Sequence, residues 1–399
     1  MRRKQEEEYM TSRERFFTVL EGEMPDRVPV TLFMYDQGHF LAQNYPDIDP
    51  WDFETYQLKN IELQKQFGAD VYVRLLGDII DPNIIYGGLD VSREAENWEV
   101  HTEEIQDGDN LVKRSTIRTP EGELTQDFTI TAQGNNTYVH ACTKKPIASP
   151  EDLAIARKYE PGPSEEYTKK VRQRLATVKE ALGDDGIVGT WGPHGPFNVA
   201  SLLINHEELY SLFLVDPDFY KDLMEFALRR SYAYISVIDE AGTDIHCIGG
   251  NVPGGFLGKP AYDQYILPYE KQLVAHAQQN GTPGMYHNCG GIMNLVESYK
   301  DLGVTSVEPF SPPPLGDVAD LTEAKQRSGG EYIMLSGIDQ VNVLQKGTID
   351  ETKRVTEKAM KIGKEGGKFI MQPVDFLEYG TPVENVEAYV KTALQFASY

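Results

Sequence analysis

The sequence predicts a (β/α)8 TIM barrel, an α/β fold in which eight parallel strands alternate with helices. Continuous apolar runs alternate with amphipathic helical segments over most of the 399 residues, which is typical of a parallel sheet. About eight such strand–helix units follow one another, and eight is the number that closes a barrel. An open doubly wound sheet is the alternative, but no Gly-x-Gly-x-x-Gly motif follows the first strand to support a dinucleotide-binding fold.

The expected elements follow from apolar spacing and from helix-capping residues. Thr11 or Ser12 can cap the first helix, and Gly22 ends it. The expected strands are 26–34, 70–76, 187–191, 244–248, 283–287, 304–308, 332–336 and 368–372. The expected helices include 11–20, 56–67, 167–182, 219–241, 262–280 and 348–363.

The alternation stops between residues 89 and 146. Segments of alternating polarity in this region are separated by turn signals such as Pro120-Glu121-Gly122, which indicates antiparallel β-hairpins. We expect a β-rich insertion after the second strand, acting as a lid or an interface, within one barrel domain that spans residues 1–399.

Composition narrows the class of protein and the kinds of partner. Hydrophobic residues make up 40% of the chain and charged residues 25%, as in a soluble globular protein. The formal net charge of -24 argues against nucleic acid and anionic membranes as partners. No apolar run approaches the length that crosses a bilayer, and the charged N-terminus is not a secretory signal. The presence of only three cysteines favours a cytoplasmic location.

Polar side chains gather at the predicted strand ends. In a barrel the loops that follow the strands face one cavity, so we expect these side chains to converge there. Asp36 and Asp339 could instead cap the helices that follow them, and Trp191 could simply fill the barrel mouth. The candidates, in chain order, are Tyr35, Asp36 and His39, Trp191 and His194, Cys247 and Asn251, His287 and Cys289, Glu308, Asp339, Gln372 and Asp375.

His287 and Cys289 are the strongest candidates for metal ligands. They end a predicted strand, where a spacing of two places both side chains on one side. Imidazole and thiolate are good zinc ligands, and Cys247 and Glu308 on the neighbouring strands could complete a tetrahedral set. The structural alternative is a hydrogen-bonded histidine beside quietly buried cysteines.

Three separated stretches resemble the uroporphyrinogen decarboxylase superfamily, which includes corrinoid-dependent methyltransferases. The resemblance implies a (β/α)8 barrel. Decarboxylases of this superfamily use no metal and hold their substrate with an arginine-rich segment after the first strand, where residues 34–39 contain no arginine. The matching stretches are 11–29; 241–247 with 267–269 and 287–290; and 335–339 with 347–353 and 380–385.

The methyltransferase branch is more similar to this chain. Its zinc members carry a His-x-Cys motif that matches His287 and Cys289, and a further cysteine shortly before a Thr-Pro-x-Glu-Asn stretch. Here that preceding region has no cysteine, and Asp375 stands near the expected position. The resemblance therefore implies either that Cys247, Glu308 or Asp375 completes the site or that the metal has been lost. The β-rich insertion is similar to that in methyltransferases of anaerobic O-demethylation.

The expected function is methyl transfer between a small methylated substrate, such as a methoxylated aromatic compound, and a corrinoid carried by a partner protein. Zinc would act as a Lewis acid on the leaving oxygen. Transfer from a methylcorrinoid to a thiol or folate, and a metal-free decarboxylase-like or tetrapyrrole-binding barrel, are the alternatives. The chain could form a homodimer, although the sequence does not fix its oligomeric state. We expect acid–base chemistry from His194, Tyr35 and Asp36. We expect substrate binding by Trp191, Asn251 and Asp339.

Overall fold

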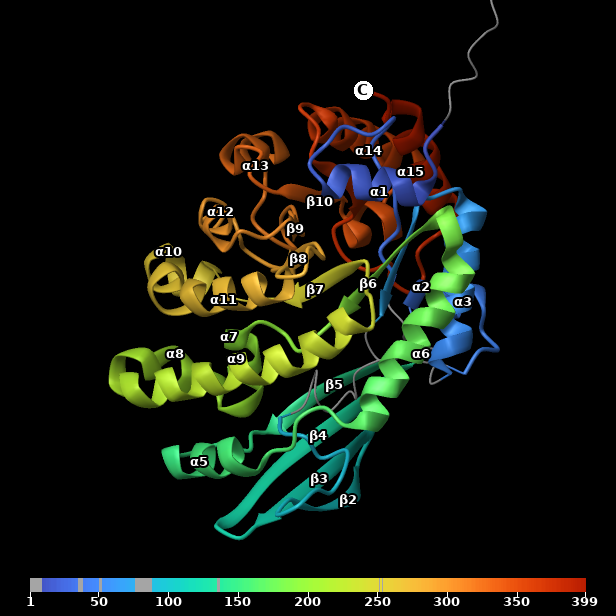
Figure 1. The fold of residues 1–399 in the computed structure, drawn as a ribbon. Coiled ribbons are helices and arrows are strands. Elements are labelled where there is room, and N and C mark those ends of the chain that lie inside the picture. Colours follow the sequence, from blue (N-terminus) through green and yellow to red (C-terminus); the bar gives the residue numbers. More distant parts are fainter. Residues whose placement is uncertain are drawn as a thin grey trace, which may run out of the picture.

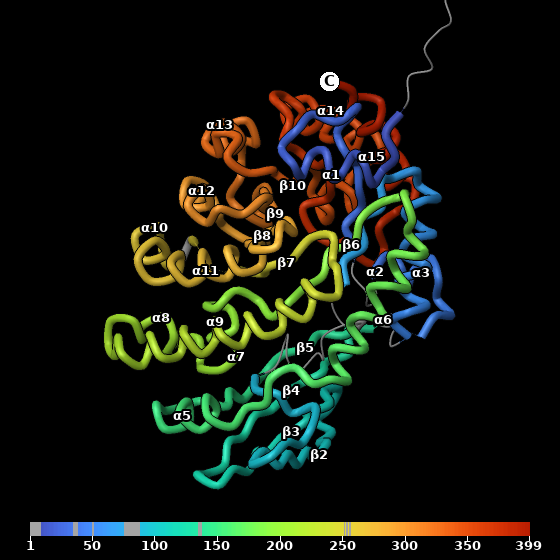
Figure 2. Tube along the Cα trace, viewed as in Figure 1, coloured from blue at the N-terminus to red at the C-terminus, as the bar shows by residue number. Residues whose placement is uncertain are grey.

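A seven-stranded parallel sheet forms the centre of the molecule. The computed structural model describes residues 9–34, 39–49, 52–75, 88–134, 137–250, 252 and 254–399. The strands lie in the order β1-β6-β7-β8-β9-β10-β11, and Figures 1 and 2 show the sheet curled inside a layer of helices. The strands are Val71–Leu75 (β1), Gly186–Trp191 (β6), Ile245–Gly249 (β7), Gly284–His287 (β8), Ser306–Glu308 (β9), Ile333–Ile338 (β10) and Phe369–Pro373 (β11). Seven of the eight predicted strands are thus confirmed.

Strand side chains alternate between the two faces of this sheet, as the pleat requires. On β7, Cys247 packs in one buried cluster with Tyr72 and Met285, whereas Ile248 packs in another with helix residues. His246, two residues before Ile248, points to a helix, and its Nε2 lies 3.0 Å from the Asp239 carboxylate. The face that carries Cys247 is therefore filled with side chains.

The six predicted helical segments are confirmed to within a few residues, and the structure has further helices outside them. The first predicted cap is confirmed, because Thr11 Oγ1 accepts the Glu14 N–H at 3.1 Å while the Glu14 carboxylate accepts the Thr11 N–H at 2.8 Å. The α-helices are Ser12–Leu20 (α1), His39–Asn44 (α2), Phe53–Phe67 (α3), Pro150–Tyr159 (α5), Glu165–Leu182 (α6), Pro196–Leu203 (α7), His206–Val215 (α8), Pro217–Glu240 (α9), Gly254–Ala261 (α10), Leu267–Ala277 (α11), Ser298–Leu302 (α12), Leu321–Ser328 (α13), Ile349–Lys364 (α14) and Val383–Phe396 (α15). Short 3-10 or π turns are Gly183–Asp185 (η1), Tyr262–Ile266 (η2) and Gln340–Gln345 (η3).

The predicted strand at 26–34 is not a regular strand and makes only isolated bridges. Its backbone nevertheless bonds to both edges of the seven-stranded sheet. Met371 on β11 donates to the Pro29 carbonyl at 2.9 Å and accepts the Thr31 N–H at 2.9 Å. On the other side, the Asp70 N–H donates to the Val30 carbonyl at 2.7 Å, immediately before β1. The segment therefore lies between β11 and the start of β1.

The buried Asp70 carboxylate holds this segment in place. It accepts hydrogen bonds from Arg15 at 2.6 Å, from Arg27 at 2.6 Å, from Ser12 at 2.7 Å and from the Val30 N–H at 2.8 Å. Two guanidinium groups pair with one fully buried carboxylate, and the backbone bond satisfies a further lone pair. Helix α1 and segment 26–34 are consequently tied to the start of β1.

A second, antiparallel sheet lies at one end of the molecule, next to α5 and α6 in Figure 1. The hairpin segments predicted between 98 and 130 form its first three strands, but the sequence did not predict the fourth. Buried Gln126 joins this sheet to the chain after β1: its Oε1 accepts the Leu89 N–H at 2.7 Å and its Nε2 donates to the Leu89 carbonyl at 3.1 Å. The strands are Glu99–Asp107 (β2), Asn110–Thr119 (β3), Gly122–Gly134 (β4) and Thr137–Lys144 (β5).

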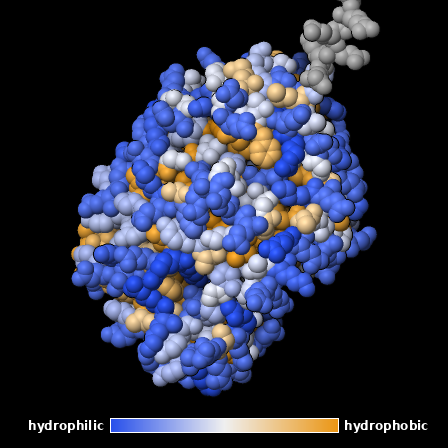
Figure 3. All heavy atoms as spheres, viewed as in Figure 1, coloured by the Kyte–Doolittle hydropathy of each residue, from blue (hydrophilic) through white to orange (hydrophobic). Residues whose placement is uncertain are grey.

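The visible surface is mainly hydrophilic, with apolar residues scattered over it (Figure 3). Among the described residues, no helix combines the length and the apolar character that a membrane crossing requires.

Candidate functional site

The C-terminal ends of four strands bring His287, Glu308, Gln372 and Arg74 together. His287 on β8 is in register with Glu308 on β9, and its Nδ1 lies 2.9 Å from the Glu308 carboxylate. Gln372 on β11 donates to the same carboxylate at 2.7 Å. Because parallel strands in register send equivalent side chains to one face, residues more than 200 positions apart share one buried network.

Arg74 on β1 is the centre of this network. Its guanidinium donates two hydrogen bonds to Glu308, at 2.7 and 2.8 Å, and a third to Gln372 at 2.9 Å. It also lies over the rings of Phe33 and Tyr72, 3.8 and 4.2 Å from their centroids. Arg74 and Glu308 are fully buried. This bidentate pair fixes the carboxylate that contacts His287.

We did not single out Arg74 from the sequence. The available signal was an arginine in the middle of the strand at 71–75, every residue of which is buried. A charged side chain in such a strand needs a charged partner, because an unpaired buried charge is costly. The sequence gives no means of choosing that partner.

The network sets the charge of its members. Burial lowers the pKa of His287, but hydrogen bonds to Cys289 and Glu308, together with their charges, outweigh it and raise this pKa to about 10. Burial raises the pKa of Glu308, but the Arg74 charge and the His287 hydrogen bond lower it to about 2. At neutral pH a cationic imidazole thus meets an anionic carboxylate.

Trp191 and His194 lie beside this network, as predicted. The buried Trp191 ring makes edge-on contacts with both histidines, its centroid 5.6 Å from that of His287 and 6.0 Å from that of His194. Burial, and then repulsion by the His287 charge, lower the pKa of His194 to about 4. A neutral His194 can orient a polar group or accept a proton, but at neutral pH it is a poor general acid.

Cys247 does not join His287 and Cys289. It pairs with Met285 in the β7–β8 register, whereas Gly249 is the β7 residue level with His287. Two residues along a strand correspond to about 6–7 Å. The Cys247 sulfur lies 3.4 Å from the Tyr72 hydroxyl, and burial raises the pKa of this thiol to about 12. Cys247 is a buried core residue, which was the structural alternative.

Glu308 lies close to His287, but its contacts are not those of a metal ligand. Its oxygens accept bonds from Arg74, Gln372 and His287. A carboxylate on one imidazole nitrogen typically orients the ring and leaves the other nitrogen to bind. Glu308 is therefore placed to orient His287.

His287 and Cys289 remain as a donor pair. Asp375 faces His287; burial raises the pKa of this carboxyl, and the His287 charge only partly opposes the rise. Imidazole, thiolate and the carboxylate behind the ring suit zinc chemically. In the described part of the chain, however, no group of three or more His, Cys, Asp or Glu side chains could hold a metal ion. These residues do not complete a zinc site, so we derive no step from a metal.

Three predicted site residues, Tyr35, Asp36 and Asn251, lie outside the described residues. Asp339 is described, and it caps the segment after β10. Its Oδ1 accepts the N–H groups of Val341 and Asn342 at 2.8 and 2.7 Å, and its Oδ2 accepts the Asn342 side chain at 2.8 Å. Asp339 also lines a cavity of about 300 Å³. The observed contacts are those of a helix cap rather than a free ligand group.

We expect Asp339→Ala to lower the free energy of unfolding by about 1 kcal/mol, because two backbone N–H groups lose their acceptor. The Michaelis constant for the substrate should stay unchanged. Urea denaturation and steady-state kinetics check the two parts. Asp320→Ala is the matched control, because Asp320 caps α13 through the Thr322 N–H. A raised Michaelis constant in Asp339→Ala alone would restore the predicted role in substrate binding.

The sequence of this chain is similar to those of known methyltransferases and decarboxylases. A methylcobamide:CoM methyltransferase (MtaA) from Methanosarcina barkeri is 26% identical over 221 residues, 55% of this chain and 61% of the relative. A uroporphyrinogen decarboxylase from Streptomyces avermitilis is 26% identical over 153 residues, 37% of this chain and 41% of the relative. The chain thus spans less than two thirds of the length of these curated relatives.

A solved structure of a methyltransferase from Methanosarcina mazei has the same fold. It superposes with a TM-score of 0.69 over 97% of this chain and 99% of its own, at 17% sequence identity. The sequence pattern of the family described as uroporphyrinogen decarboxylase (URO-D) matches residues 107–396, more than half of the chain. The chain therefore belongs to the uroporphyrinogen decarboxylase family.

Proposed function

We propose that this protein is a methyltransferase that moves a methyl group between a small substrate and a corrinoid carried by a partner protein. The observation that carries the proposal is the His287–Cys289 pair at a strand end, with Glu308 behind the imidazole. The similarity to a methylcobamide:CoM methyltransferase supports it. The absence of arginine from residues 34–39 argues against binding of a porphyrinogen polycarboxylate.

The chemistry assigns distinct tasks to the protein. In methyl transfer the bond between the methyl carbon and its donor atom breaks, and the electron pair of that bond stays with the donor atom. The acceptor supplies the electron pair of the new bond. Polar groups at the donor atom stabilise its developing negative charge. Arg74 and Glu308 fix His287 for this task, Cys289 lies beside it, and Trp191 restricts access of water.

The methyl substrate that we propose is a methoxylated aromatic compound. Transfer from a methylcorrinoid to a thiol is the second candidate, because the relative from Methanosarcina barkeri is named a methylcobamide:CoM methyltransferase. A panel of methoxylated aromatics, thiols and folates, each assayed with a reduced or methylated corrinoid protein, tests the class of substrate. Turnover of a thiol alone would reverse the proposed direction.

Zinc binding by His287 and Cys289 is a separate proposal, and it requires further ligands, because the described residues supply only this donor pair. Elemental analysis of the purified protein tests it. About one zinc per chain that is lost in Cys289→Ala would support a metal site, and absence of metal in a fully active protein would exclude it.

We also propose that residues 1–399 form one barrel domain. Segment 26–34 would act as the eighth strand, since its backbone bonds to both β11 and the residue before β1. Residues 89–146, which include the four antiparallel strands, would then be an insertion in this barrel.

A further inference from the structure

Glu270, in the first turns of α11, is a buried carboxyl group to which the proposed chemistry assigns no role. Its side chain is fully buried. Within the described ranges, no Lys, Arg or His side chain forms an ion pair with it. A buried carboxylate without a cation is costly, so such a group takes up a proton or serves a particular purpose.

The Glu270 carboxyl supports the loop that carries His194. Its Oε1 accepts the Phe197 N–H at 3.3 Å, at the start of α7. Both carboxyl oxygens lie so close to Gly195 that a Cβ there would overlap them. The Gly195 N–H in turn donates to the Gly249 carbonyl at 2.5 Å. Glu270 therefore packs directly behind the turn that links β6 to α7.

The same contacts determine where His194 lies. A Cβ at Gly249 would overlap His194 Nδ1, so the imidazole rests directly on the end of β7. His194 Nδ1 is buried and has no hydrogen-bond partner among the residues that the structure describes. Since no side chain bonds this nitrogen, packing against Trp191 and Gly249 and the backbone of its own loop set the position of the ring, and that backbone rests on Glu270.

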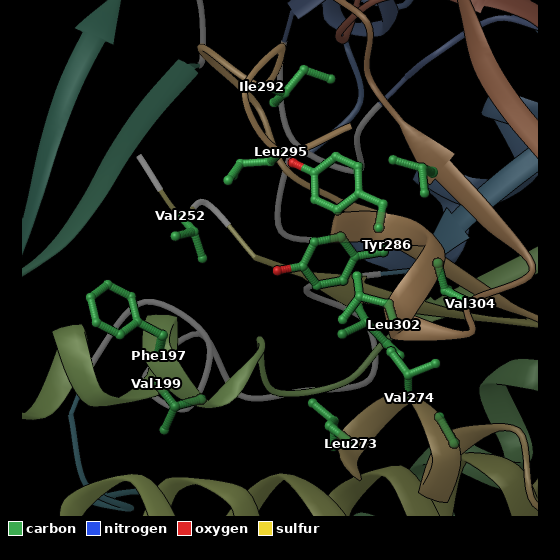
Figure 4. Packing of buried hydrophobic residues seen from close by; sticks show 14 of the residues in the cluster. Phe197, Val199, Val252, Leu273, Val274, Tyr286, Ile292, Leu295, Leu302 and Val304 are labelled. Atoms are coloured by element: carbon green, nitrogen blue, oxygen red, sulfur yellow. The ribbon is translucent and has the colours of Figure 1, made fainter. Parts of the chain in front are cut away.

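The surroundings of Glu270 are aromatic and uncharged. Tyr286 on β8, Tyr262 on η2 and Tyr220 on α9 lie near enough to interact electrostatically with it. Figure 4 shows the Tyr286 ring among apolar side chains, with its hydroxyl pointing toward the side of Val252. Burial raises the pKa of Glu270 to about 8, and the Phe197 N–H and Tyr286 only partly oppose this rise.

We propose that Glu270 is a positioning residue, which as an uncharged carboxylic acid holds the loop at 192–197 and so sets the place of His194 beside His287. For catalysis this inference rests on the proposed methyl transfer, but the effect on His194 does not depend on activity. Ionisation of Glu270 would place an uncompensated charge behind the loop and displace it.

Three variants test the proposal. Glu270→Gln imitates the neutral acid, and Glu270→Ala removes the carboxyl group. Glu387→Gln is the exposed control, because Glu387 lies on α15 and loses only an ion pair with Lys391. We expect Glu270→Gln to keep at least half of the wild-type kcat at pH 7. Glu270→Ala should lose about 100-fold, as displaced catalytic groups do. The His194 imidazole resonance, assigned with His194→Gln, should move in Glu270→Ala and stay in Glu270→Gln.

The pH dependence of unfolding tests the role of Glu270 without any assay of activity. The pKa of Glu270 is raised from 4.5 to about 8 on folding. The stability that this raised pKa contributes is full below about pH 4.5 and is lost as the pH rises through about 8. The melting temperature of the wild type should therefore fall relative to that of Glu270→Gln over this window, whereas Glu387→Gln should follow the wild type.

Two outcomes would overturn the inference: Glu270→Gln as impaired as Glu270→Ala, or parallel melting curves for the wild type and Glu270→Gln at all pH values. If the wild type transfers no methyl group with any substrate, the proposed function fails. The His194 resonance and the melting curves then still decide the role of Glu270.

Discussion

Replacement of His287 by alanine should lower kcat for methyl transfer by about 10²–10⁴-fold, the range for loss of a positioned polar group in a transition state. His287 joins the Glu308–Arg74 network to Cys289, so its loss removes the polar contact that we propose at the reacting atom and leaves the Glu308 carboxylate without its imidazole partner. Steady-state kinetics with the corrinoid partner protein and the active methyl substrate measure the effect.

Cys289→Ala should produce a loss of the same order, because Cys289 interacts directly with His287. Cys142→Ala is the control, since Cys142 is a buried cysteine in the second sheet. Wild-type kcat in both His287→Ala and Cys289→Ala would mean that the reaction occurs elsewhere. A similar loss in Cys142→Ala would point to a general defect in folding.

Replacement of Arg74 by methionine should lower the free energy of unfolding by about 3–5 kcal/mol. Methionine is of similar length and uncharged, so the variant leaves the fully buried Glu308 carboxylate without its guanidinium partner. Urea denaturation at pH 7 measures the loss. Arg118→Met is the matched control, because Arg118 pairs with Glu123 on the surface, and such pairs contribute about 0–1 kcal/mol.

The double variant Arg74→Met/Glu308→Gln should be more stable than Arg74→Met alone, because it removes the stranded charge as well as its partner. Additive losses in the double variant, or equal losses in Arg74→Met and Arg118→Met, would contradict the account of the network. Either result would mean that Glu308 is not held as a buried anion.

Most strands and several helices of this fold could be predicted because apolar periodicity is a local property. Two differences among the strands have physical reasons. Segment 26–34 is apolar, as a strand would be, but Pro29 lacks the N–H that a regular ladder requires, and the segment bonds to its neighbours only in part. Strand β5 has no apolar alternation strong enough to predict it, and its pairing with β4 stabilises it.

Only the residues that lie at the ends of predicted strands could be assigned to the site from the sequence. His287, Trp191 and His194 lie together because the ends of parallel strands share one edge of the sheet. Whether Cys247 lies beside His287 depends on the register of β7 and β8, which no local sequence pattern predicts. The role of Glu308 depends on Arg74, which lies 234 residues away in the sequence. Long-range pairing of this kind was beyond a single sequence.

The visible absorption spectrum of the corrinoid during turnover tests the central claim most directly. A catalytic amount of the protein is mixed with its reduced corrinoid partner and a methoxylated aromatic, or with the methylated partner and a thiol. We predict conversion between the reduced and methylated spectra in one of these mixtures, with a rate proportional to the concentration of the protein and strongly reduced in His287→Ala. Unchanged spectra in every mixture, together with release of carbon dioxide from uroporphyrinogen, would contradict the account.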